Sequence, residues 1–265
     1  MSELLDATGD QRQAALDRAA ELLRAGELVV LPTDTLYGVA ADAFNLDATT
    51  ALRTVKERDR AVPLPVLVRT PKQLPGFVAA VPAAAERLIA AFWPGPLTLV
   101  LALKGGLRWD LGRTDGAVSV RMPLDEVVLE LIREVGPLAA TAANAPGGAS
   151  PATAQDARAQ LGEGVAAVVD DGPRDAARST IVDLTRAAPR VLRDGALPTP
   201  LVLEVAAGEL DPVAAAAALT EGGEQDAAAD GVEGTAEDPS TVTPVDARPL
   251  DGLRRRPRDG RGEGK

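Results

Sequence analysis

The sequence contains no cysteine and no histidine, and only six of its 265 residues are aromatic. These absences exclude disulfides, Ser-His-Asp and Cys-His triads, and the histidine and cysteine ligand sets of structural zinc and haem sites. Any catalysis therefore uses Lys, Arg, carboxylates, hydroxyls, Asn, backbone N–H groups or a borrowed metal ion. The low aromatic count also argues against single-stranded nucleic-acid binding, which relies on stacking platforms.

Long hydrophobic runs are missing as well. No apolar stretch approaches the roughly 18 residues that span a bilayer. The first ten residues, MSELLDATGD, include acids but no basic segment of the kind that opens a signal peptide. Because the lack of cysteine also fits a reducing compartment, we expect a cytoplasmic protein with no membrane association. Hydrophobic residues make up 46% of the chain, enough for one domain of about 200 residues with an appendage, or for two small domains.

The net charge of −11 is concentrated near the C-terminus. Residues 201–247 hold eleven acids and no base, whereas residues 248–265 hold seven bases and three acids. From residue 222 onward the chain is rich in Gly, Asp, Glu, Pro and Ala, so it cannot bury enough apolar surface to offset the entropy of ordering. We therefore expect a folded domain over residues 1–205, a terminal helix within 206–221 and a disordered tail, acidic and then basic, over 222–265.

The first 200 residues alternate between helical and strand patterns. Stretches with apolar residues three and four positions apart predict helices, and short runs of Val, Leu and Ile predict buried strands. The helices are expected over residues 11–25, 47–58 (with Asp47 as the N-cap), 83–92, 125–135 and 212–219. The strands are expected over 27–32, 65–68, 97–103, 117–122, 137–141, 165–170, 179–184 and 190–193. This pattern predicts an α/β protein with a mixed sheet rather than a plain doubly wound fold.

The standard nucleotide-binding and hydrolase fingerprints are absent: the chain has no GxxxxGK[ST], no GxSxG and no HExxH, and no GxGxxG follows a strand. Polar and small residues gather instead where the expected strands and helices end, and strand ends are where α/β proteins bind ligands. Taken singly, each cluster is equally typical of a polar turn, a basic helix C-terminus or a packed corner. The clusters are PTDTLYG at 32–38, KERDR at 56–60, FWPGPLT at 92–98, SVRMP at 119–123, ATAANAPGGASP at 140–151, RSTIVD at 178–183 and LRDG at 192–195.

In this order the clusters resemble the YrdC-like threonylcarbamoyl-AMP synthase family. The resemblance covers roughly residues 15–200, almost all of the expected folded domain, and does not include the tail. It implies a YrdC-like twisted mixed sheet with flanking helices and a ligand cleft, in the short form without a second folded domain. The strings that carry it are GELVVLPTDTLYGVAADAFN, KERDRAVPLPVLV, FWPGPLTLVL, VSVRMP, AATAANAPGGASP, STIVDLT and RVLRDGA.

Members of this family form threonylcarbamoyl-AMP and pyrophosphate from L-threonine, bicarbonate and ATP, and the product feeds the threonylcarbamoyladenosine modification of tRNA. The resemblance implies that Mg2+ enters with ATP and that the protein supplies no metal ligand. It makes tRNA and the tRNA threonylcarbamoyl-transfer proteins candidate partners. The residues implied to bind threonine are Thr35, Arg121 and Ser179. The residues implied to bind ATP are Lys56, Arg58, Asn144, Ser150 and Arg193, of which Lys56 and Arg58 are also implied to be catalytic.

Three positions depart from the family pattern. Ala142 stands where the family has the serine of its SxN motif, and loss of that hydroxyl contact costs about 1.5–3 kcal/mol. A water molecule or Thr141 is the candidate to replace it. Asp125 stands in place of the RMPxH histidine, and Val62 in place of a basic or polar residue before the Pro-Leu pair.

Two other functions stay open at this stage. A relative that binds nucleotide or RNA without synthesis is favoured by Ala142, although the net charge of −4 over residues 1–200 provides no broad basic surface. An interaction protein that recruits partners through its acidic tail is favoured by the tail, but this leaves the polar loops unexplained. Threonine-dependent turnover of ATP separates the synthase from both.

Overall fold

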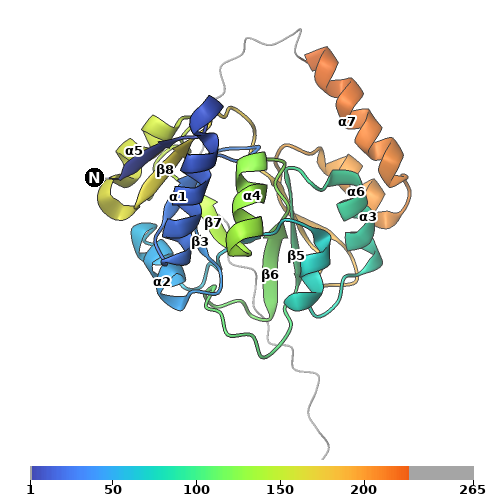
Figure 1. Ribbon diagram of the computed structural model, residues 1–265. Helices are drawn as coiled ribbons and strands as arrows, with labels where there is room; N and C mark the ends of the chain where they lie inside the picture. Colours follow the sequence, from blue (N-terminus) through green and yellow to red (C-terminus); the bar gives the residue numbers. More distant parts are fainter. Residues whose placement is uncertain (1, 227–265) are drawn as a thin grey trace, which may run out of the picture.

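The computed structural model describes residues 2–226, which form a ten-stranded sheet with helices on both faces (Figure 1). Across the sheet the strand order is β1-β8-β2-β3-β7-β4-β6-β5-β9-β10. The strands are β1 (Glu3–Asp6), β2 (Val29–Leu31), β3 (Gly38–Asp42), β4 (Val66–Leu67), β5 (Leu97–Ala102), β6 (Ala117–Arg121), β7 (Leu138–Ala142), β8 (Ala167–Asp170), β9 (Thr180–Asp183) and β10 (Arg190–Arg193). The α-helices are α1 (Arg12–Arg24), α2 (Leu46–Val55), α3 (Ala83–Phe92), α4 (Glu126–Val135), α5 (Ala154–Leu161), α6 (Thr199–Ala207) and α7 (Pro212–Asp226).

The sheet mixes both strand orientations. β8 pairs in parallel with β1 and β2, β4 with β6, and β5 with β9. The pairs β2–β3, β3–β7, β4–β7, β5–β6 and β9–β10 are antiparallel. The mixed α/β sheet predicted from the sequence is therefore confirmed.

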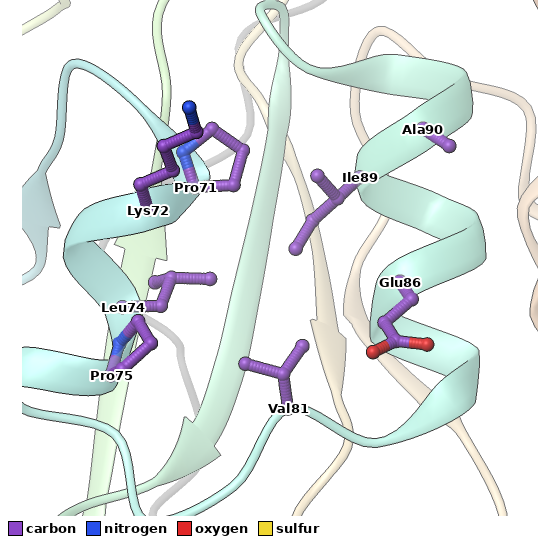
Figure 2. A pocket seen from close by; sticks show the side chains of 8 residues that line it. All are labelled: Pro71, Lys72, Leu74, Pro75, Val81, Glu86, Ile89 and Ala90. Carbon is purple, nitrogen blue, oxygen red and sulfur yellow. The ribbon is translucent and has the colours of Figure 1, made fainter.

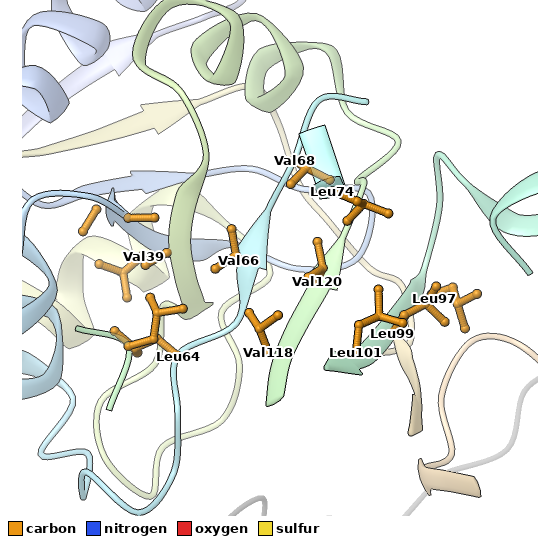
Figure 3. Packing of buried hydrophobic residues seen from close by; sticks show 14 of the residues in the cluster. Val39, Leu64, Val66, Val68, Leu74, Leu97, Leu99, Leu101, Val118 and Val120 are labelled. Atoms are coloured by element: carbon orange, nitrogen blue, oxygen red, sulfur yellow. The ribbon is translucent and has the colours of Figure 1, made fainter. Parts of the chain in front are cut away.

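Two hydrophobic clusters cover the two faces of the sheet, because successive strand residues point to opposite sides. In β2, Val29 and Leu31 belong to the cluster that contains α1 and α4, whereas Val30 belongs to the cluster that contains α2, α3, α5 and α6. Figure 3 shows this second cluster, where Val118 and Val120 of β6 lie among side chains of the neighbouring strands. Full burial of each such side chain stabilises the fold by about 1.5–3 kcal/mol, so both faces hold the sheet rigid under the loops at its strand ends.

Helix α2 differs from its prediction at both ends. Its N-cap is Asn45, whose Oδ1 accepts the N–H groups of Asp47 and Ala48 at 3.1 Å, so the assignment of Asp47 as the cap was wrong. The helix ends at Val55 rather than at residue 58, because Glu57 takes the left-handed conformation with φ +45°. A helix cannot continue through that conformation. The residues that follow Val55 therefore lie in a loop.

Two strands, β1 and β3, and two α-helices, α5 and α6, escaped prediction. Strand β3 has the sequence GVAAD, which is poor in strand-forming residues, and it forms because it pairs with β2 on one side and with β7 on the other. Tertiary pairing thus overrides a weak local preference.

Helices α6 and α7, at the C-terminal end of the described residues, pack on α3. Helix α7 begins at Pro212, as the sequence indicated, and continues to Asp226, so residues 222–226 are helical rather than disordered as predicted. The rest of the predicted disordered tail, residues 227–265, lies outside the described residues. Within residues 2–226 no helix is both long and apolar enough to cross a bilayer.

Candidate active site

The turn between β2 and β3 is shaped by a threonine hydroxyl. Thr33 Oγ1 accepts the N–H groups of Thr35 and Leu36, both at 3.2 Å, and donates to the Leu36 carbonyl at 2.6 Å. It also lies 3.0 Å from Thr35 Oγ1, and both threonines are buried. Local hydrogen bonds of this kind hold a turn without help from packing. The turn fixes the hydroxyl of Thr35, which the family resemblance assigns to threonine.

Arg121 ends β6 and reaches the same turn. Its Nη1 donates to Thr35 Oγ1 at 3.0 Å, its Nη2 to Asp34 Oδ1 at 2.6 Å, and its Nε to the Gly95 carbonyl at 3.0 Å. A guanidinium has five N–H donors, so these three contacts leave two for a ligand. The structure therefore brings together Thr35 and Arg121, which are 86 positions apart in the chain.

The ion pair between Arg121 and Asp34 is buried, with side chains 9% and 10% exposed. Asp34 Oδ2 is buried too, and among the described residues it has no hydrogen-bond partner. Sequence reasoning did not single out Asp34, although its place inside the PTDT string was a usable signal. Its carboxylate neutralises one face of Arg121 and orients the guanidinium.

Ser179 and Arg193 form a second group beside the first. Ser179 Oγ lies 2.9 Å from Thr98 Oγ1 and accepts from Arg193 Nη2 at 3.0 Å. Arg193 also donates to the Ser179 carbonyl, from Nη2 at 2.8 Å and from Nε at 3.1 Å. Burial, with smaller contributions from the charges of Arg178 and Arg121, lowers the pKa of Arg193 to about 10. The Gly95-Pro96 segment joins the two groups, because Arg121 donates to the Gly95 carbonyl and the N–H of Thr180, next to Ser179, donates to the Pro96 carbonyl at 2.9 Å.

Lys56 and Arg58 follow α2 in the loop that begins after Val55. The ammonium of Lys56 donates to the backbone carbonyl of Asn144 and, at 2.8 Å, to Asn144 Oδ1. Burial lowers the pKa of Lys56 to about 8, with a smaller contribution from the charge of Arg58. The structure thus joins Lys56 and Asn144, as the resemblance implied.

Arg58 is held by backbone oxygens. Its Nε donates to the Val62 carbonyl at 3.0 Å and its Nη2 to the Pro63 carbonyl at 3.1 Å. Its Nη1 lies 3.4 Å from Thr141 Oγ1, a weak contact from the residue next to Ala142. Burial lowers the pKa of Arg58, and the charge of Arg53 adds to the effect. The side chain is therefore fixed in direction before any substrate arrives.

The loop after β7 approaches its neighbours closely. Gln160 Oε1 accepts the N–H of Ala145 at 2.9 Å, and a Cβ atom on Gly148 would lie 2.6 Å from that same oxygen. A side chain at position 148 would therefore displace the Gln160 amide from its contact with Ala145, which glycine avoids. Ser150 Oγ is buried in this loop and has no hydrogen-bond partner among the described residues. The structure does not bring Ser150 into contact with Lys56, so its predicted role in binding ATP stays a prediction.

Strand pairing brings the two halves of the site together. Gly38, which follows the Thr35 turn, pairs with Ala142, and the N–H of Ala143 donates to the Tyr37 carbonyl at 2.9 Å. The turn that contains Thr35 therefore adjoins the loop that contains Asn144 and holds Lys56. The side of the site that contains the Thr35 turn therefore presents hydroxyls and guanidiniums. The side that contains the Asn144 loop presents an ammonium and a guanidinium.

An apolar groove of about 360 Å3 lies elsewhere, between α3 and the 3-10 helix Pro71–Gly76 (Figure 2). It contains none of the predicted site residues. Its mostly apolar walls do not suit a triphosphate or an amino acid, whose charges require hydrogen-bonding partners. The residues that line it are Pro71, Lys72, Leu74, Pro75, Val81, Glu86, Ile89 and Ala90.

The fold and the site together define a mixed-sheet α/β protein whose loops gather cationic side chains suited to anionic ligands. The comparisons with known proteins agree on one family. A family model named Sua5_yciO_yrdC and described as telomere recombination matches residues 21–195. A putative threonylcarbamoyl-AMP synthase of Mycobacterium tuberculosis is 48% identical over 207 residues, which are 77% of this chain and 95% of that protein.

More distant relatives share a shorter part of their length with this chain. The threonylcarbamoyl-AMP synthase of Bacillus subtilis is 37% identical over 183 residues, 68% of this chain and 53% of the relative. The crystal structure of P. abyssi Sua5 complexed with L-threonine matches with a TM-score of 0.70 and 33% identity, over 80% of this chain and 62% of that chain. This chain belongs to the Sua5/YciO/YrdC family. The family and the fold class predicted from the sequence are confirmed.

Proposed function

We propose that this protein is a threonylcarbamoyl-AMP synthase, which forms threonylcarbamoyl-AMP and pyrophosphate from L-threonine, bicarbonate and ATP. The observation that carries the proposal is the contact of Arg121 with Thr35, beside a loop where Lys56 meets Asn144. The groups of Arg121 and Thr35 suit an amino acid, and the loop where Lys56 meets Asn144 suits phosphates. The sequence predicted this enzyme class. The mycobacterial relative that is 48% identical to this chain is named as a putative enzyme of the same class.

Threonine is proposed to bind at Thr35, Arg121 and Ser179. The two remaining N–H donors of Arg121 suit the bidentate geometry of a carboxylate. The hydroxyls of Thr35 and Ser179 each accept one bond from an arginine and share a second with a neighbouring threonine hydroxyl, which leaves one hydrogen-bonding position on each oxygen for a ligand. The crystal structure of a relative, P. abyssi Sua5, as a complex with L-threonine supports this choice of ligand.

ATP is proposed to bind at Lys56, Arg58, Asn144, Ser150 and Arg193. The threonine amine attacks carbon dioxide and loses a proton, or attacks bicarbonate and releases water, to give a carbamate. A carbamate oxygen then forms a bond with the α-phosphorus, and the bond from that phosphorus to the bridging oxygen breaks as pyrophosphate leaves. These steps need positioning and fixed positive charge more than a protein nucleophile, so the absence of histidine and cysteine is no obstacle.

Mg2+ is proposed to enter with ATP, held by the triphosphate and by water. Within residues 2–226 no group of three or more Asp or Glu side chains is arranged to hold a metal ion. The ion supplies charge neutralisation on the phosphates. Lys56 and Arg58 supply the positive charge that stays with the protein.

The product is proposed to serve the threonylcarbamoyladenosine modification of tRNA. On this proposal, tRNA and the tRNA threonylcarbamoyl-transfer proteins are the downstream partners. A cytoplasmic location is part of the same proposal.

Release of pyrophosphate tests the function directly. The purified chain is incubated with ATP, Mg2+ and bicarbonate, with and without L-threonine. Release that depends on threonine is the expected result. Bound ATP without release would favour the second candidate, a nucleotide-binding relative without synthesis, for which Ala142 is the favouring observation. In that case Ala142→Ser becomes the next protein to assay.

The affinity for ATP is expected to fall above pH 8. A neutral Lys56 no longer attracts phosphate, and a group with a pKa of about 8 is mostly charged at pH 7 and mostly neutral at pH 9. KM for ATP at saturating threonine is therefore expected to rise up to about tenfold between pH 7 and pH 9. Lys56→Arg stays charged throughout this range and is expected to flatten the profile. Equal slopes in the two proteins would contradict the role of Lys56.

Deletion of residues 227–265 is expected to change threonine-dependent release by less than about twofold. The contacts of the site lie before residue 197, and the alignment with the mycobacterial relative takes in 95% of that protein with 207 residues. The measurement compares kcat and both KM values of the shortened and full chains. A loss of activity of tenfold or more would show that the segment belongs to the working enzyme.

A further inference from the structure

Arg174 lies between β8 and β9 and connects three parts of the chain through one guanidinium. Its Nε donates to the Thr33 carbonyl at 3.0 Å. Its Nη2 donates to Asp171 Oδ2 at 2.7 Å and to Asp125 Oδ2 at 3.2 Å, and its Nη1 donates to the Asp171 carbonyl at 2.8 Å. A planar guanidinium holds several acceptors in fixed directions at once, which an ammonium on a flexible stem cannot do.

Asp125 anchors this arrangement on α4. Its Oδ1 accepts the N–H of Val128 at 3.1 Å and so caps the helix, while Oδ2 accepts from Arg174. The Asp125 side chain is 6% exposed and that of Arg174 is 19% exposed. A carboxylate buried this deeply requires a cation. Asp125, which stands where the family has a histidine, has Arg174 as that cation in this chain.

The bond to the Thr33 carbonyl leads from Arg174 to the site. Thr33 Oγ1 shapes the turn that presents Thr35, and Thr35 Oγ1 accepts from Arg121. The backbone N–H of Arg174 also donates to the Ala152 carbonyl at 2.7 Å, in the loop that contains Ser150. One residue therefore fixes the base of the turn on the threonine side and touches the loop on the nucleotide side.

We propose that Arg174 is a positioning residue for threonine, acting through the backbone of the Thr33–Thr35 turn. The inference rests on the proposed function of this site. Because Arg174 acts on groups that bind threonine before the reaction begins, its loss weakens substrate and transition-state binding together. That pattern raises KM for threonine and leaves kcat and KM for ATP close to their original values.

Arg174→Lys is the informative variant, since it keeps the positive charge near Asp125 and Asp171 and loses the planar fork. KM for threonine is expected to rise about tenfold, with kcat changed by less than about threefold. Asp125→Asn retains a side chain that caps helices and removes the charged anchor. It is expected to raise KM for threonine in the same direction, with a combined effect in the double variant smaller than the product of the two.

Arg158→Lys is the matched control. Arg158 is also half-buried and also holds a backbone oxygen, that of Ser2 at 2.7 Å, at the β1 edge of the sheet. The kinetic constants of the Arg158→Lys variant are expected to equal those of the unchanged protein. Thermal midpoints are recorded for all variants, because a purely structural role would lower the midpoint and disturb both substrates alike.

An unchanged KM for threonine in Arg174→Lys would overturn the inference. So would a fall in kcat with equal rises in both KM values and a matching loss of thermal stability. Either result leaves threonine-dependent release by the unchanged protein in place, and so leaves the proposed function standing. Absence of that release from the unchanged protein would instead refute the proposed function, and the role of Arg174 with it.

Discussion

Lys56→Ala and Arg58→Ala are each expected to lower kcat/KM for ATP by at least about 100-fold while leaving the fold intact, because removal of one fixed group that stabilises developing negative charge typically costs that much. Neither side chain belongs to the two hydrophobic clusters, so truncation removes no core packing. Each is held in place by neutral oxygens, those of Asn144 for Lys56 and the carbonyls of Val62 and Pro63 for Arg58. The measurement is steady-state pyrophosphate release, with circular dichroism and thermal unfolding as checks of the fold.

Arg60→Ala serves as the control for this pair. Arg60 is two positions beyond Arg58, its side chain is 63% exposed, and it pairs with Asp110 at 2.8 Å. Water and salt weaken an exposed ion pair of this kind, so its loss is expected to alter neither stability nor turnover noticeably. Wild-type rates in both Lys56→Ala and Arg58→Ala would remove these residues from the site.

Arg121→Met is expected to abolish threonine-dependent release and to destabilise the fold by about 3–5 kcal/mol. The loss of activity follows from the proposed contact with the threonine carboxylate. The loss of stability has a separate cause: the side chain of Asp34 is 10% exposed, and removal of Arg121 leaves its charge buried without a cation. Urea unfolding measures the second effect, and pyrophosphate release measures the first.

A double variant separates the two effects of Arg121. Arg121→Met combined with Asp34→Asn no longer buries an unpaired charge, so most of the lost stability is expected to return. Activity is not expected to return, because the guanidinium is still missing. A double variant that regains turnover would show that Arg121 supports the fold alone. One that stays as unstable as the single variant would show that the ion pair is not the source of the stability.

The parts of the site that the sequence predicted well are those with a local signature. Thr35 follows β2 and Arg121 ends β6, two strands with a strong apolar pattern, so the sequence indicated where each residue lies, whereas their roles toward threonine stay proposals. The helix over residues 83–92 was predicted at its observed bounds because its apolar spacing continues up to the Trp93-Pro94 step that ends it. In such stretches the local preference and the tertiary structure agree.

The parts that escaped prediction depend on contacts between distant positions. Arg174 and Asp125 are 49 positions apart, and nothing in the sequence around either one indicates the other. Asn45 and Asp47 are both good cap residues, and only the observed backbone shows which one accepts the first N–H groups of α2. Strand β3 was overlooked because its alanines carry little strand preference of their own.

Arg121, proposed to bind threonine, and Lys56, one of the cations proposed to bind ATP, lie in different electrostatic surroundings. Arg121 is already paired with the carboxylate of Asp34, so an arriving threonine meets a guanidinium whose attraction is short-ranged and set by direction. Lys56 is surrounded by the dipoles of an amide, so its full charge extends outward and no counter-ion has to leave when a triphosphate arrives. On this proposal the turn beside Arg121 selects a small zwitterion, and the neighbouring loop that contains Lys56 binds a polyanion.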